Sequence, residues 1–170
     1  MRLKKEGDFE KLAVIEERLR NSPKLEKFLM RKLASKEVGI LRMIDYYVYY
    51  RDIVNKPIPA IENKIRNNYL TLVNSRLQNP EGFSHDEVDF LNTNLQSILK
   101  QRMHTPEFQQ KLDDLYITAL NNEVSGVVMI GGFVANSKNP QVFEALQRAR
   151  ESANPKLQKA ADGVLKKMNM

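Results

Sequence analysis

The sequence predicts an all-α protein of stacked antiparallel helical hairpins, arranged as a bundle or a short α-solenoid. Apolar residues recur at intervals of three and four along most of the 170-residue chain, and this spacing gathers side chains on one face of a helix. Four prolines each follow a residue that commonly caps a helix. No alternation of period two lasts long enough to require a sheet. We therefore expect about nine helices joined by short connections.

The first part of the chain contains five expected helices, over 8–20, 24–36, 38–54, 60–78 and 84–103. Pro57 and Pro59 must end the helix before them, and Ser84 with Glu87 has the spacing of a capping box. Four of these helices carry apolar stripes, formed by Phe9, Leu12, Ile15 and Leu19; by Leu25, Phe28, Leu29 and Leu33; by Ile61, Ile65, Tyr69 and Leu72; and by Val88, Leu91, Leu95 and Ile98, followed by Arg102.

The second part of the chain contains the remaining expected helices, over 106–120, 123–136, 140–152 and 155–168. Thr105, Asn139 and Asn154 each precede a proline, so their side chains can cap a helix whose first residue lacks an N–H. Residues 124–135 are apolar around most of a helical circumference, which predicts a buried helix. The glycines of this run do not form a phosphate-binding loop, because no strand precedes them and no Gly-Lys-Ser/Thr ending follows.

Two segments of the second part show a weak internal repeat. Apolar residues in 106–119 correspond to residues 34 positions later, in 140–153. In the following helix the offset is 33, and Val124 corresponds to Leu157. On these residues, 106–168 resembles HEAT-like α-hairpin repeats, although only two units are evident and glycines interrupt one helix. The resemblance implies stacked hairpins that scaffold proteins or hold nucleic acid. A generic antiparallel bundle would give a similar period. The pairs at offset 34 are Phe108–Val142, Leu112–Leu146, Leu115–Ala149 and Ala119–Ala153.

Length and composition indicate one domain over 1–170, with a subdivision into a bundle over 1–103 and HEAT-like hairpins over 104–170 as an alternative. A chain of this size can bury about 70% of its unfolded surface, so it needs no disulfide or metal to fold. The absence of cysteine excludes thiolate chemistry. Acidic residues follow the basic N-terminus at once, and no apolar run approaches the length of a bilayer span. We expect a soluble, cytoplasmic protein with no membrane span.

A tyrosine-rich segment, 43–52, is the first candidate binding surface. Helical geometry places Met43, Tyr46, Tyr47 and Tyr50 on one broad face that we expect to join the core. Tyr49 falls on the opposite, charged side. Tyr49, Arg42 and Arg51 are therefore candidate contacts for a protein partner, since tyrosine and arginine anchor many interfaces. The alternative is a central helix packed on two sides.

Basic residues near the C-terminus are the second candidate surface. The net charge is +6 and much of the positive charge alternates with acids, but a local excess runs from 148 to 167. Arg148 and Arg150 are candidate protein contacts on the outer face of 140–168. If the basic side chains converge, they would contact phosphates of a nucleic acid. The candidates for phosphate contacts are Lys156, Lys159, Lys166 and Lys167.

No local pattern indicates a catalytic centre, a metal site or a cofactor. His85 and Asp89 share a helical face, but two ligands do not close a metal site. Asp113 and Asp114 are adjacent, so they point in different directions and do not converge on one substrate. We expect a non-enzymatic scaffold or adaptor that binds a protein. A nucleic-acid-binding module is the alternative, and an enzyme whose site residues are distant in sequence is the third reading.

Overall fold

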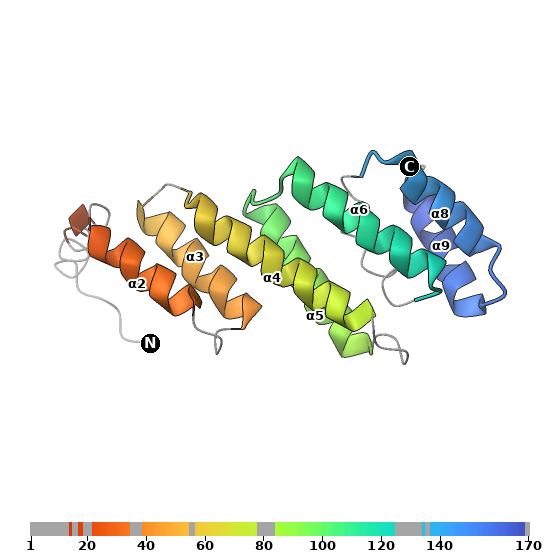
Figure 1. Ribbon diagram of the computed structural model, residues 1–170, viewed down its shortest axis with the longest axis horizontal. Helices are drawn as coiled ribbons and strands as arrows, with labels where there is room; N and C mark the ends of the chain where they lie inside the picture. The colour runs from red at the N-terminus through yellow and green to blue at the C-terminus, as the bar shows by residue number, and fades with distance from the viewer. Residues whose placement is uncertain are drawn as a thin grey trace, which may run out of the picture. The chain divides into compact units, whose positions relative to one another are not determined.

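The computed structural model describes residues 14, 17–18, 22–34, 39–54, 57–77, 84–124, 134 and 137–168. This part of the chain is all-α and contains no strand. Most observed bounds lie within two residues of the predicted ones. Most of the expected helix 123–136 and most of the expected helix 8–20 lie outside the described residues. The helices are α2 (Pro23–Ala34), α3 (Ile40–Val54), α4 (Pro59–Leu77), α5 (His85–Lys100), α6 (Pro106–Asn121), α8 (Pro140–Arg150) and α9 (Pro155–Met168) (Figure 1).

The chain divides into two compact units, residues 1–65 and residues 66–170. The first seven residues of α4 therefore belong to the first unit and the rest of the helix to the second. The alternative domain division predicted from the sequence, 1–103 and 104–170, lies instead between the helices α5 and α6.

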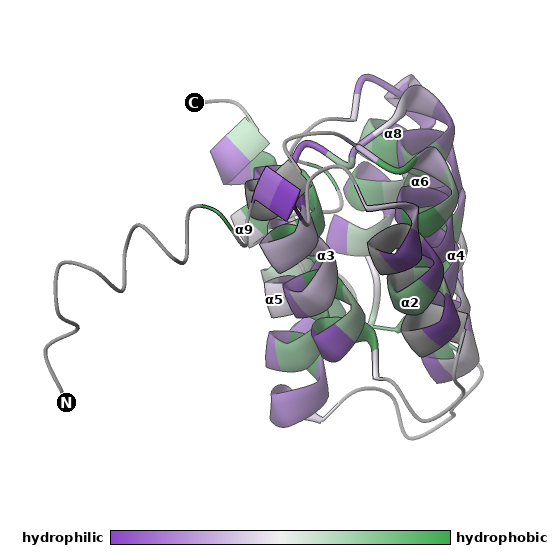
Figure 2. Cartoon of the chain, turned by 90° about the vertical axis from the view of Figure 1, so that its left-hand side faces the viewer, coloured by the Kyte–Doolittle hydropathy of each residue, from purple (hydrophilic) through white to green (hydrophobic). Residues whose placement is uncertain are grey.

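The first unit contains α2, α3 and the start of α4. α2 packs against α3, and the apolar residues of α3 and α4 form the described core. Helices with one buried side carry both hydrophobic and hydrophilic residues, as Figure 2 shows. Phe28, predicted to lie on a buried stripe of α2, is instead 49% exposed. The buried residues of this unit are Ile40, Met43, Ile44, Tyr47, Tyr50, Ile58, Ile61 and Ile65.

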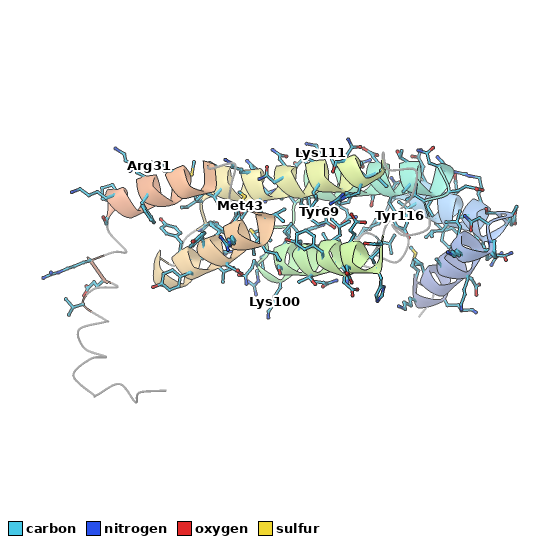
Figure 3. The ribbon with its side chains drawn as sticks, turned by 90° about the horizontal axis from the view of Figure 1, so that it is seen from below. Arg31, Met43, Tyr69, Lys100, Lys111 and Tyr116 are labelled. Atoms are coloured by element: carbon cyan, nitrogen blue, oxygen red, sulfur yellow. The ribbon has the colours of Figure 1, made fainter. Side chains whose placement is uncertain are left out.

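The second unit contains the remainder of α4 with α5, α6, α8 and α9. α8 packs against both α6 and α9. Tyr69 of α4, labelled in Figure 3, is fully buried. It meets the ring of Phe108 edge-on, with 6.2 Å between centroids. The buried guanidinium of Arg66 donates a hydrogen bond of 2.6 Å to the Met103 carbonyl. These contacts fix α4 to α6 and to the connection between α5 and α6.

The predicted N-terminal caps are confirmed at the helices of the second unit. Ser84 and Glu87 form a complete capping box. Thr105 accepts a hydrogen bond from the Phe108 N–H, and Asn139 accepts one from the Gln141 N–H. Asn154 accepts hydrogen bonds from the N–H groups of the residues that follow Pro155. Each side chain satisfies a donor that the first helical turn leaves without an internal partner.

The C-terminal ends of α5 and α6 share a motif that the sequence did not reveal. After α5, Arg102 is left-handed with φ 56°, and hydrogen bonds run from Arg102 N–H to Leu99 and from Met103 N–H to Ile98. This pattern is a Schellman motif, which usually has glycine at the left-handed position. The predicted helix 84–103 was therefore too long, and Arg102 lies beyond the helix. Glu123, with φ 57°, ends α6 in the same way.

The repeat positions are buried in part. Phe108 and Leu112 are buried, as are Val142 and Leu146, their partners at an offset of 34. The correspondence weakens at the end of the helices, where Ala119 is buried and Ala153 is exposed. The offset of 33 also pairs Val127 with Ala160 and Val128 with Ala161, and residues 127 and 128 lie outside the described residues.

Candidate functional site

One side of α3 is exposed and carries two tyrosines. Arg42, Asp45, Tyr46 and Tyr49 follow the spacing i, i+3, i+4, i+7 and are all exposed, so they form one surface that we call the tyrosine face. Tyr49 is 68% exposed, in agreement with its predicted position. Tyr46 was expected in the core but is 45% exposed. It lies at the edge of the apolar face, because Met43, Tyr47 and Tyr50 already fill the buried side.

The neighbouring Tyr47 has a structural role. Its hydroxyl accepts a hydrogen bond of 2.8 Å from the Ile58 N–H and donates one of 2.5 Å to Glu62. Burial, followed by the hydrogen bond to Glu62, raises the pKa of this phenol. The guanidinium of Arg51 lies 5.8 Å from the Tyr47 ring centroid and 3.9 Å from Glu62. Arg51, a predicted interface residue, therefore belongs to the contact between α3 and α4 and lies on the opposite side of α3 from the tyrosine face.

The basic residues of α8 and α9 are exposed but differ in arrangement. Arg148 and Arg150 lie on opposite flanks of the buried stripe of α8, about 160° apart, and do not share a face. The four lysines of α9 fall within an arc of about 100° opposite the buried side of the helix. Gly163 lies inside this arc, with open space where a Cβ would be. The lysine face therefore consists of Lys156, Lys159, Lys166 and Lys167 around Gly163.

An open groove of about 770 Å³ lies between the N-terminal ends of α6 and α8. We call it the α6–α8 groove. Pro106 and Pro140 contribute to its lining, together with polar residues, which are Asp113 and Gln109 from α6, His104 before it, and Lys138 and Gln141 around the start of α8. Asp113 is 3% exposed and Gln109 is 7% exposed, whereas Lys138 is exposed. A buried acid and an exposed base therefore line the same concave surface.

A hydrogen-bonded chain connects the polar groups on the α6 side of the groove. The amide nitrogen of Gln109 donates to Asp113 Oδ1 at 2.7 Å, and the amide oxygen lies 2.8 Å from His104 Nε2. Because the carboxylate oxygen accepts, Gln109 is oriented with its oxygen toward the histidine, and His104 Nε2 donates to it. The His104 ring also meets Phe108 edge-on. These contacts hold the side chains of His104, Gln109 and Asp113 in fixed orientations.

Sequence reasoning found the exposed surfaces but missed the groove. It predicted correctly that Asp113 and Asp114 point in different directions, since the first is buried and the second is exposed. The spacing of Gln109 and Asp113, four residues apart on one helix, was a signal for their hydrogen bond. Nothing in the sequence connects Lys138 with them.

The described residues contain no group of three or more side chains that could hold a metal ion. His85 and Asp89 share a face as predicted, 3.8 Å apart at an exposed position. Within the described part of the chain, no helix is long and apolar enough to cross a membrane. Comparison with family models, curated proteins and solved structures gives no match.

Proposed function

We propose that this chain is a non-enzymatic helical scaffold or adaptor that binds another protein through the tyrosine face of α3. The observation that supports this proposal is the difference in burial among the tyrosines of α3. Tyr47 and Tyr50 are buried, whereas Tyr46 and Tyr49 share a single exposed face with Arg42. Exposed rings side by side on one helix supply the apolar area that interface anchors require.

The chemistry of the tyrosine face indicates the partner surface that would fit it. A tyrosine buries a large ring with the loss of only two side-chain torsions, and its hydroxyl can keep a hydrogen bond at the rim. Arg42 adds a cation beside the rings. The complementary surface is a protein with an apolar pocket for Tyr49 and a carboxylate that meets Arg42.

We propose stacked hairpins as the architecture of the second unit, which would present the outer faces of α8 and α9 rigidly. The packing of α8 against α6 and α9 supports this proposal, as do the buried pairs Phe108–Val142 and Leu112–Leu146. Neighbouring hairpins in HEAT-like proteins bury their apolar faces against one another and leave their outer faces for partners.

Affinity capture from the native source would identify the partner, and binding would then be measured with the two purified proteins. Tyr49→Ala should weaken this measured affinity by about tenfold or more, as expected for an aromatic anchor. Phe143→Ala is the matched control, because Phe143 is an exposed aromatic residue on α8. Circular dichroism would establish that both variants fold. Equal affinity of the wild type and the Tyr46→Ala/Tyr49→Ala variant would refute the proposal.

A nucleic acid is the second candidate partner, and the lysine face of α9 is the observation that favours it. Four lysines on one arc would contact successive phosphates, although Lys166 also pairs with Asp162 at 2.7 Å. Binding to a DNA duplex should weaken steeply as salt rises, and Lys156→Glu/Lys159→Glu should abolish it. Lys111→Glu on α6 is the control at an exposed lysine outside this face (Figure 3). Binding that does not change with salt would exclude this reading.

A further inference from the structure

The α6–α8 groove contains a largely buried carboxylate that accepts a hydrogen bond from the Gln109 amide. Asp113 is 3% exposed and lines the groove. Among the described residues, its hydrogen-bond donor is the Gln109 amide, and no lysine, arginine or histidine lies within ion-pair distance of it. Removing a carboxylate from water is costly unless several donors or a cation compensate. The groove is where such a cation can reach Asp113.

The opposite wall of the groove has the complementary charge. Lys138 is exposed beside the start of α8 and has no carboxylate partner within the described part of the chain. Gln141 lines the same wall. A negatively charged group placed here would meet an ammonium and an amide, close to the positive end of the α8 dipole. The groove therefore has one wall suited to a cation and one suited to an anion.

We infer that the α6–α8 groove binds a small zwitterion, with an ammonium group on Asp113 and a carboxylate on Lys138. Asp113 Oδ1 is already oriented by Gln109, which is in turn held by His104, so the acceptor for the ammonium is preorganised. A volume of about 770 Å³ is within the range of small-molecule sites. This inference is independent of the tyrosine face, which lies on another helix.

Titration of the ¹⁵N-labelled full chain with 5-aminopentanoate, followed by NMR, tests the inference. The probe has an ammonium and a carboxylate separated by a short chain. We expect saturable shifts of the Gln109 side-chain amide and of backbone amides at 138–141. Pentylamine, with the cation alone, should bind more weakly, and pentanoate, with the anion alone, should bind most weakly. Two sources offer an ammonium and a carboxylate together: a free zwitterion, and adjacent side chains of a partner protein. A tetrapeptide with adjacent lysine and glutamate residues represents the second source, and its affinity is compared with that of 5-aminopentanoate.

Substitutions on the two walls of the groove then show which wall binds the ammonium of the probe and which binds its carboxylate. Asp113→Asn keeps the size of the side chain and should weaken 5-aminopentanoate by about tenfold or more, because it removes the charge that meets the ammonium. Asp114→Asn is the matched control, since Asp114 is the adjacent exposed carboxylate and should leave the affinity unchanged. Lys138→Gln, at an exposed position where folding is not at risk, should weaken 5-aminopentanoate severalfold but leave pentylamine unaffected.

Two results would overturn the inference. One is the absence of saturable shifts at the groove for both 5-aminopentanoate and the peptide at millimolar concentration. The other is equal weakening by Asp113→Asn and Asp114→Asn, which would show that the probe responds to overall charge and not to the buried carboxylate.

Discussion

Tyr47 and Tyr49 show how much the surroundings of one residue decide its role. Both belong to α3, yet Tyr47 is fully buried and Tyr49 is 68% exposed. The Tyr47 hydroxyl joins the Ile58 N–H, just before α4, to Glu62 in the first turn of that helix. Since Pro57 and Pro59 cannot donate backbone hydrogen bonds, this phenol provides a polar contact where the chain enters α4.

Removal of the Tyr47 hydroxyl should therefore destabilise the protein. We expect Tyr47→Phe to lower the free energy of unfolding by about 1–3 kcal/mol, because the N–H of the buried Ile58 loses its acceptor. Tyr49→Phe is the matched control and should change stability by less than about 0.5 kcal/mol at its exposed position. Urea unfolding of the two variants measures the difference, and equal effects would contradict the structural role of Tyr47.

At the scale of the element, local chemistry predicted helix beginnings better than helix ends. Ser84, Thr105 and Asn139 cap their helices as expected, because a cap depends on residues adjacent in sequence. The end of α5 was misplaced, since Arg102 continued the apolar rhythm by position and no glycine indicated a left-handed residue. The side of α3 that Tyr46 occupies also depends on which neighbours fill the core, and the helical period alone does not determine this.

The end of α5 gives a second prediction. A side chain at φ 56° costs about 1 kcal/mol relative to glycine, so Arg102→Gly should stabilise the protein by about that amount. Gln101→Gly is the control one position earlier, where φ is −82° and glycine brings only added flexibility in the unfolded chain. Thermal unfolding should therefore show a higher Tm for Arg102→Gly and a lower one for Gln101→Gly. If both variants had a lower Tm than the wild type, residue 102 would not be strained.

At the scale of the whole molecule, the groove shows why a functional site can escape sequence reasoning. Asp113 and Lys138 are brought to one concave surface by the packing of α6 against α8. Neither residue lies in a recognisable motif. The burial that makes Asp113 unusual arises only when distant helices pack, whereas the tyrosine face and the lysine face each depend on one helix and could be read from its period.

Buried tyrosines also link the stability of the fold to pH. Burial raises the pKa of Tyr69 and of Tyr116 above the ordinary value of about 10. The folded protein therefore retains phenol protons that the unfolded chain releases as the pH rises above about 10. The stabilisation is fully present below that pH and declines above it, by about 1.4 kcal/mol per pH unit for each tyrosine. Urea unfolding at a series of alkaline pH values should show this decline. Tyr69→Phe should reduce the decline in the free energy of unfolding by about 1.4 kcal/mol per pH unit. Tyr49→Phe is the control and should leave the decline unchanged. An unchanged decline in Tyr69→Phe would mean that this buried phenol does not govern alkaline unfolding.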